Sequence, residues 1–527
     1  MDVKNPTRRT MLTGSLGTAG LFGLSFAMAD SAQAAQEMLP TVHGTDLVND
    51  LDLVTTKEWH LARRACTAPT KLTVADIEAK GLTKWLDDQI DYTSIDDSVY
   101  ESERAKIFPF YGMSGEDMAK KPWQWTETYA GYLSRATLHE QWRSKRQLRA
   151  SSTNFFADLL SFSTDKVEKA GGCTAVNAIR DNALGKYKDM LKAMEYSVGM
   201  NAFLDNRGNT KAVPNQNLAR ELLELHTVGV GNYTQADVID ATTVLTGMDE
   251  VGGYVLDFNP DQHQNGAVKI GSWSNANSGG SRAACHATFD SLLDYLAHHP
   301  ATAKRIATRM AIHYVSDTPP QSIIDKLAKV YLANDTAIGP MFKTLFTSDE
   351  FYASVGQKIR RPQIVAASAL AAGQRSPRMD ILAPYDVIRG NYFSEVTRMI
   401  DVAGHRAYSK TFPDGFPLES APWITGTSLL SLINLEQLAF WRSAEVTVPD
   451  WMSVCNLTNQ MRYRESVPKA IQELTGFTVT NADVWRPISA AWQGNLATLP
   501  SIFKMGSPNR IQFVAASIFA SPMFLVS

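Results

Sequence analysis

The sequence predicts a mainly α-helical protein, with a large, bundle-like body of many helices, a long polar loop, and a short strand or hairpin near residues 251–285. Apolar residues recur at three- and four-residue spacing through most of the chain, while alternating strand patterns are scarce. The chain has 527 residues, 44% of them hydrophobic, which is enough to build a sizeable core. These observations favour packed helices over an extended sheet.

The first 34 residues have the pattern of an export signal. Arg8 and Arg9 stand directly before the weakly apolar run "GSLGTAGLFGLSFAMA", and "AQA" ending at Ala34 is a small-x-small cleavage site. A paired arginine with both flanks predicts a twin-arginine signal peptide over residues 1–34. The alternative is an uncleaved membrane anchor, but the apolar run is shorter than the roughly 20 residues that a spanning helix needs. We therefore expect a periplasmic or secreted protein with no transmembrane span in the mature chain.

Cleavage after Ala34 leaves residues 35–527, which we expect to form a single helical unit. Its core motif region covers about 171–372, and a C-terminal helical part covers about 373–527. In the C-terminal part, "GQRSPRMD", "KTFPDGFPLESAPW" and "VTVPDW" bring proline and glycine between shorter helices. A second lobe and an extension of one helical body both fit this change in composition.

Charge and cysteine usage exclude several classes of function. The formal net charge of −3 gives no basic excess for nucleic acid and no polybasic run for a lipid surface. The four cysteines lie far apart without a C-x-x-C pair, which excludes closely spaced zinc sites and disulfide-dense scaffolds but leaves one or two bridges open. The twin-arginine route carries folded chains and so permits a cofactor, but the sequence identifies none.

Two neighbouring segments show the helical pattern well. In "HPATAKRIATRMAIHYVSD", Ile306, Met310 and Tyr314 align on one stripe, while the charges of Arg305 and Arg309 fall away from it. The following "TPPQSIIDKLAKVYLAN" repeats the apolar spacing after a short proline-containing turn. The short connection predicts that the two helices pack as antiparallel neighbours.

The segment "NLARELLELHTVGVGNYTQADVIDATTVLTG", residues 217–247, carries two carboxylates on one predicted helix. At about 100° per residue, Glu221 and Glu224 lie side by side at the border of the apolar stripe. The favoured interpretation is a structural acidic pair held by buried arginines where helices cross. Two others remain open: one carboxyl with a raised pKa for acid–base work, and a metal site. His226 lies about 200° around the helix from Glu224, which argues against the metal.

The rest of the segment predicts a tight corner between two helices. Gly229 and Gly231 end the first helix, and Thr234 starts the second as an N-cap with Asp237 at its third position. Gly247 suits the left-handed position after the second helix. Much of "GVGNYTQADV" is therefore explained without a ligand.

Common catalytic signatures are absent from the mature chain. It contains no H-E-x-x-H, no G-x-S-x-G, no Walker loop and no G-x-G-x-x-G before a helix. The sequence therefore leaves open whether the protein is an enzyme. The polar stretch at residues 251–285 breaks the helical pattern, and a loop of this length is more often functional than idle.

Several blocks resemble the bacterial family known as domain of unknown function 1800. They occur in the family's order, from "RDNALGKYKDMLKAM" and "FLDN" through "PNQNLARELLELHTVGVGNYTQADV" to "HHPATAKRIATRMAIHYVSDTPP" and "PDGFPLESAPWITGT". The resemblance implies a largely helical exported protein, often encoded beside a second exported family related to sulfatases and phosphatases. This chain departs from the family's pattern at Leu159, where a histidine is usual, and at Gln264, where an aspartate is usual.

These observations lead to one principal hypothesis and one alternative. The principal one is an extracytoplasmic, hydrolase-like enzyme that uses a carboxyl as acid or base on an envelope or extracellular polymer. The alternative is a non-catalytic binding or assembly protein for the co-exported partner. We predict no metal ligands. The candidate site residues are Glu221 and Glu224 as catalytic groups, and Arg180, Arg220, His263 and Lys269 as substrate-binding groups.

Overall fold

The computed structural model describes ten stretches of the chain. The predicted export signal, residues 1–34, lies outside them. The described residues are 53–121, 129–167, 169–380, 392–425, 430–431, 434, 446–447, 449–458, 460–490 and 510–527.

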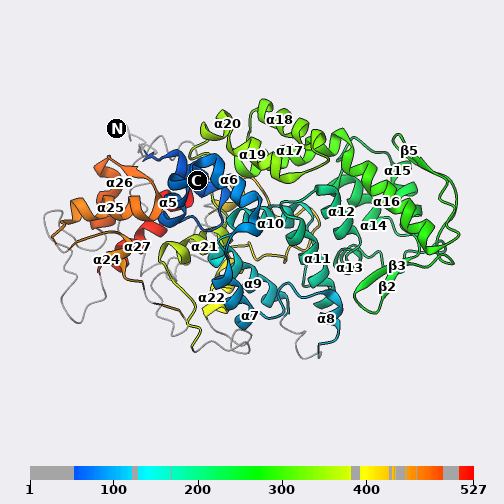
Figure 1. Cartoon of the computed structure of the whole chain (residues 1–527), viewed down its shortest axis with the longest axis horizontal. Coiled ribbons are helices and arrows are strands. Elements are labelled where there is room, and N and C mark those ends of the chain that lie inside the picture. The colour runs from blue at the N-terminus through cyan, green and yellow to red at the C-terminus, as the bar shows by residue number, and fades with distance from the viewer. Residues whose placement is uncertain are drawn as a thin grey trace, which may run out of the picture.

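Helices dominate the described residues, which confirms the predicted fold class (Figure 1). The N-terminal helices are α4 (Lys57–Ala65), α5 (Lys71–Lys80), α6 (Leu82–Ile90), α7 (Ser98–Ile107), α8 (Gly115–Ala119), α9 (Tyr129–Arg143) and α10 (Gln147–Leu159). The central helices are α11 (Lys169–Asn182), α12 (Tyr187–Glu195), α13 (Val198–Phe203), α14 (Asn217–Glu221), α15 (Gln235–Leu245), α16 (Arg282–His298), α17 (Pro300–Tyr314), α18 (Gln321–Ala333), α19 (Ile338–Phe346), α20 (Asp349–Tyr352) and α21 (Pro362–Ala372). The C-terminal helices are α22 (Tyr392–Val402), α24 (Trp451–Val454), α25 (Tyr463–Thr475), α26 (Ala482–Ala490), α27 (Arg510–Phe519) and α28 (Pro522–Leu525).

Short antiparallel strand pairs complete the described fold. The predicted hairpin near 251–285 is present as β2 (Met248–Val251) with β3 (Val255–Phe258), and a second hairpin follows as β4 (Val268–Ile270) with β5 (Trp273–Asn275). Near the other end of the molecule, β1 (Leu53–Val54) pairs with β6 (Thr478–Val479). This last pair joins the start of the described chain to its C-terminal part.

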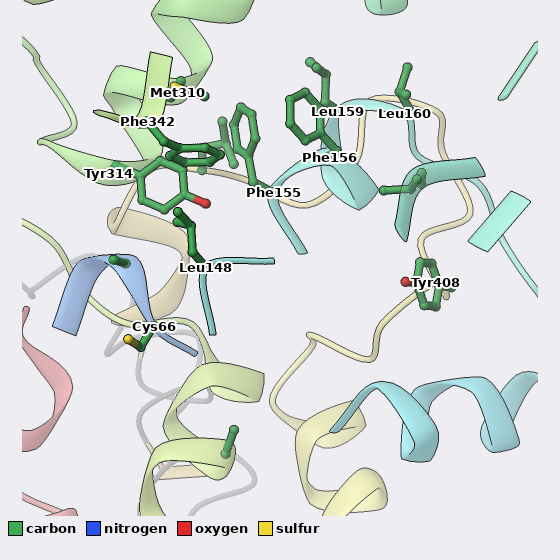
Figure 2. Packing of buried hydrophobic residues seen from close by; sticks show 14 of the residues in the cluster. Cys66, Leu148, Phe155, Phe156, Leu159, Leu160, Met310, Tyr314, Phe342 and Tyr408 are labelled. Carbon is green, nitrogen blue, oxygen red and sulfur yellow. The ribbon is translucent and has the colours of Figure 1, made fainter. Parts of the chain in front are cut away.

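The central core forms where α10, α17 and α19 meet (Figure 2). The ring of Tyr314 packs edge-on against Phe342, with centroids 5.3 Å apart, and lies 5.8 Å from the ring of Phe155. Ile306 and Met310 on the same stripe of α17 are fully buried, as the spacing predicts. Helices α17 and α18 pack against each other along their lengths, so the prediction that they are neighbours is confirmed.

A buried arginine connects the first helix to the last ones. The Arg63 guanidinium on α4 donates hydrogen bonds to the backbone carbonyls of Thr475, Met523 and Val526. It also lies over the ring of Phe477, 4.1 Å from the centroid. These carbonyls stand at helix ends, where no intrahelical N–H is available to them. Arg63 therefore satisfies groups that would otherwise be buried without a partner.

The structure bears on two further expectations, namely the pairing of the cysteines and the absence of a transmembrane span. All four cysteines, including Cys66 and Cys455, are buried and none forms a disulfide, so neither of the bridges left open by the sequence forms. Burial raises the pKa of the Cys455 thiol to about 12, which keeps it protonated. Across the described residues, every helix is too short or too polar to cross a bilayer.

We expect Arg63→Lys to lower the free energy of unfolding by about 3 kcal/mol, because one ammonium cannot replace a planar fork that serves three carbonyls. Urea unfolding followed by circular dichroism measures this loss. The matched control is Arg464→Lys, whose parent side chain is 57% exposed, and which should change stability by less than about 0.5 kcal/mol. Equal stability of the two variants would contradict the assigned role of Arg63.

Candidate functional site

The helix that carries the two glutamates changes its geometry partway along. Residues Asn217–Glu221 form α14, but Leu222–His226 form a π turn, whose hydrogen bonds run from i to i+5. The Thr227 hydroxyl donates to the Leu222 carbonyl at 2.5 Å and closes this turn. A π turn takes about one residue more than an α turn, so the regular 100° rotation fails beyond Glu221. Single π turns occur frequently at functional sites.

The corner after the π turn follows the sequence prediction. The Gly229 N–H donates to the Leu223 carbonyl at 2.9 Å, and Gly229 has a left-handed φ of +83°. Thr234 and Asp237 form a reciprocal capping box at the start of α15. The predicted helix–turn–helix corner is therefore confirmed, and it fixes where the π turn ends.

The π turn directs His226 into the protein, where it pairs with a carboxylate from another helix. The His226 Nδ1 lies 2.7 Å from Oε1 of Glu195, the last residue of α12, and both side chains are fully buried. Among the described residues, His226 Nε2 and Glu195 Oε2 have no hydrogen-bond partner. The Tyr187 hydroxyl donates to the His226 carbonyl at 2.5 Å and holds this backbone in place. No local sequence pattern indicates Glu195, and the spacing on a regular helix relates His226 only to a metal site.

The structural interpretation requires partners that hold both carboxylates, and Glu221 has none in the described chain. Its carboxyl is half-buried, and within the described chain it forms no hydrogen bond or ion pair. Burial raises the pKa of Glu221; the charges of Glu224 and Asp414 act in the same direction, and those of His226 and Arg220 oppose it. A carboxyl in this state holds its proton at higher pH than usual, as a general acid or base requires.

Glu224 is engaged by its surroundings, unlike Glu221. The hydroxyl of Tyr233, from the corner after the π turn, donates to Glu224 Oε2. Burial and this contact raise the pKa of Tyr233. On α17, the Nε of Arg305 donates to the Leu225 carbonyl at 2.9 Å. Burial lowers the pKa of Arg305, and the charges of Tyr187 and Glu224 oppose that shift. The two glutamates therefore have different environments despite being neighbours.

A C-terminal segment brings a third carboxylate to this site. Gly415 has a φ of +74°, and a Cβ placed on it would lie 2.0 Å from the Asp158 carbonyl oxygen, so only glycine fits. The Asp158 carboxylate pairs with Arg361 and is buried. This close approach holds the segment against the end of α10 and places Asp414 where its charge acts on Glu221.

The two candidate substrate-binding arginines have different surroundings in the structure. Arg220 lies beside Glu221 and donates to Gln235 Oε1 at 3.0 Å. Arg180 on α11 instead lies over the ring of Tyr111, 5.1 Å from its centroid, and pairs with its neighbour Asp181. Arg220 is thus the candidate cation whose charge acts on Glu221.

His263 and Lys269 lie on the hairpin side of α15. His263 is buried, with Nδ1 2.8 Å from the Thr246 carbonyl and Nε2 2.8 Å from the Asn277 side-chain oxygen. Both ring nitrogens are therefore used by the loop itself. Lys269 is exposed on β4, and its backbone N–H donates to Asp240 at 2.8 Å. A substrate role for either residue stays a prediction.

Metal ligation has no support in the described part of the chain. Those residues include no group of three or more His, Cys, Asp or Glu side chains placed to hold an ion. What the geometry offers is proton transfer: a half-buried carboxyl without a partner at Glu221, beside a buried imidazole at His226.

The comparisons with known proteins give one positive result. A family model described as "Protein of unknown function (DUF1800)" matches residues 60–526. No curated protein and no solved structure matches the chain.

We expect His226→Leu to destabilise the protein by about 3 kcal/mol, because it leaves the Glu195 carboxyl buried without its partner. Replacing both residues by leucine removes the unpaired group, so the double variant should be more stable than His226→Leu alone. Chemical unfolding of Glu195→Leu, His226→Leu and the double variant gives a double-mutant cycle. Additive effects of the two substitutions would show that the pair is not coupled.

Proposed function

The chain belongs to the DUF1800 family, whose description assigns no activity, and we propose that it is an exported, hydrolase-like enzyme with Glu221 as its acid–base group. The observation that carries the proposal is the half-buried Glu221 carboxyl, which lacks a protein partner among the described residues. A structural carboxylate at this depth is normally paired or hydrogen-bonded, because an unpaired one costs stability. A site that acts on a substrate keeps such a group available.

The neighbours of Glu221 support proton transfer. In the proposed hydrolysis, the neutral Glu221 carboxyl gives its proton to the leaving oxygen as the scissile bond breaks. Water adds to the other side of that bond, and the proton that it releases restores the carboxyl. Burial raises the pKa of Glu221, and the charge of Glu224, which accepts a hydrogen bond from Tyr233, adds to that shift. Arg220 offers a cation for an anionic group of the substrate.

The proposed substrate is an envelope or extracellular polymer, since the paired Arg8 and Arg9 indicate export in the folded state. Glu221 stands at the end of a helix beside an exposed C-terminal segment that includes Asp414. A carboxyl that stays partly open to solvent beside an exposed segment suits a long substrate that a closed cavity would not admit.

An alternative proposal is a binding or assembly role with the co-exported sulfatase- or phosphatase-related protein. Large apolar side chains on both sides of the motif helix favour it: Val213 is 70% exposed and Val230 is 75% exposed. A partner protein that covers such side chains gains free energy, because burial of apolar surface is favourable. In this case Glu221 would serve the contact and not a reaction.

We expect Glu221→Gln to lower kcat/KM by about 10²- to 10⁴-fold on a polymer identified by screening cell-envelope and extracellular polysaccharides and polyesters. The same variant should unfold at a higher temperature than the parent at pH 8. Because burial raises the pKa of Glu221, this residue favours folding below its unfolded-state pKa and loses that contribution as the pH rises through its folded-state pKa. The gain from Glu221→Gln should therefore shrink toward pH 4.

Two controls separate the acid–base role from a scaffold role. Glu224→Gln keeps an acceptor for Tyr233 and should reduce kcat/KM by less than Glu221→Gln does. If Glu221→Gln lowers the melting temperature at pH 8 and leaves activity unchanged, Glu221 is a structural residue and the proposal fails.

The export and partner proposals share one experiment. With natural expression, we expect the protein in the extracytoplasmic fraction, and Arg8→Lys with Arg9→Lys should retain it in the cytoplasm. An affinity pull-down from the same fraction then tests the assembly role. Capture of the sulfatase- or phosphatase-related protein, weakened by Val230→Lys, supports the alternative; its absence at native levels contradicts it.

A further inference from the structure

One face of α17 carries a row of two arginines and a histidine that begins beside the Glu221 site. Arg305, Arg309 and His313 follow each other at four-residue spacing, so they lie along one side of the helix. Arg305 is the near end of the row, because its Nε donates to the Leu225 carbonyl of the π turn. At about 1.5 Å per residue, the row extends roughly 12 Å along α17 to His313.

Arg309, in the middle of the row, is a cation without a partner. It is half-buried, so part of it stays open to solvent, and in the described chain it forms no hydrogen bond and no ion pair. Burial lowers the pKa of Arg309; the charges of Arg305 and Arg361 act in the same direction, and those of Asp158 and Glu419 oppose them. A half-buried guanidinium without a partner costs free energy, and groups in this state are candidates for ligand binding.

His313 lies one turn further along α17, in a field of positive charge. It is also half-buried, and neither of its ring nitrogens has a hydrogen bond within the part of the chain that the structure describes. Burial lowers the pKa of His313 well below its usual range, and four cations lower it further: Arg361, Lys358, Arg64 and Arg309. The imidazole is therefore neutral, with one N–H donor and one acceptor available.

Two acids of this region are already engaged by other cations. Asp158 pairs with Arg361, and Asp317 pairs with Lys358. A paired carboxylate has much of its field cancelled by its partner at short range. Among the described residues, Arg309 therefore has neither an acid nor a carbonyl group in contact, and an added anion would meet an uncompensated positive charge.

The C-terminal segment 414–420 connects the row to Glu221. At one end of the segment, the charge of Asp414 acts on Glu221. At the other end, the backbone N–H of Ser420 donates to Asp317 at 2.9 Å, three residues beyond the end of α17. The segment thus passes from the proposed acid–base group to the far end of the row, which places both in one region of the surface.

We propose that Arg309 and His313 bind an oxyanion, namely a sulfate, phosphate or carboxylate group. The Arg309 guanidinium presents its N–H donors in the fork that such groups accept, and the neutral His313 adds one N–H. A second step rests on the proposed function: the polymer that Glu221 acts on carries oxyanion groups, and one of them binds to α17 while a neighbouring linkage lies at Glu221. Anion binding itself does not depend on that function.

Thermal unfolding of the full-length protein tests anion binding directly. Sodium phosphate and sodium sulfate are titrated against sodium chloride at constant ionic strength, and the rise in melting temperature gives an apparent dissociation constant. Both anions also stabilise proteins without binding to them, because they are excluded from protein surfaces. The quantity compared is therefore the excess shift of the parent over Arg309→Gln at the same salt concentration.

We expect Arg309→Gln to weaken phosphate or sulfate binding at least about 10-fold, and His313→Phe, which keeps a ring but removes the N–H, about 3- to 10-fold. Arg309→Lys keeps the charge without the fork and should bind with intermediate affinity. The matched control is Lys304→Gln, which removes an exposed charge of α17 outside the row and should leave binding unchanged. Equal shifts in the parent and in Arg309→Gln would overturn the anion site, as would unchanged affinity in folded Arg309→Lys and His313→Phe proteins.

Polymer binding tests the substrate class separately from turnover. In calorimetry on Glu221→Gln, whose cleavage step is slowed, we expect dextran sulfate, polygalacturonate or polyphosphate to bind, and neutral dextran to bind at least about 10-fold more weakly. Adding Arg309→Gln should abolish that preference. Anion binding without any preference for these polymers would contradict the substrate class alone. Cleavage of a neutral polymer that requires Glu221 but not Arg309 would leave the proposed function standing and overturn the substrate class.

Discussion

Buried helix ends impose the constraint that shapes this fold. A mainly helical interior brings carbonyl groups without intrahelical partners away from water, and each needs a donor from elsewhere. Here arginines from other helices provide those donors: Arg64 reaches the carbonyls of Val315 and Ser354 at 3.1 Å each, and Arg305 reaches that of Leu225. Burial is costly for these cations and lowers the pKa of Arg64 to about 9. The carbonyl dipoles at helix C-termini offset part of that cost.

The same constraint explains why the two glutamates of the motif helix diverge. Arg305 donates its hydrogen bond to the Leu225 carbonyl in the π turn, and the Tyr233 hydroxyl donates to Glu224. His226 is turned inward to Glu195. Glu221 is left half-buried without a protein partner in the described chain. Proteins keep such unfavourable local arrangements mainly where function requires them, and favourable packing around the site offsets the loss of stability.

Local patterns predicted much of the scaffold around this site, but not its partners. The capping box of Thr234 and Asp237 and the left-handed Gly229 follow from residue chemistry within a few positions, and both are present. The direction predicted for His226 from regular α-helical rotation is wrong, because no local signal marks where an α-helix becomes a π turn. Glu195 lies 31 residues earlier in the chain, so its pairing with His226 depends on how α12 packs.

By itself, the sequence determined the helical class, the helix–turn–helix corner, the hairpin near residues 251–285 and the family, because each depends on short-range spacing or on motif order. Only the tertiary structure decided which charged groups meet. Arg305 was expected to point away from the apolar stripe, yet it contacts the motif helix, while His263 is enclosed by its own loop. The environment of Glu221 likewise comes from segments far apart in the chain, because burial and charge proximity are properties of packing and not of local sequence.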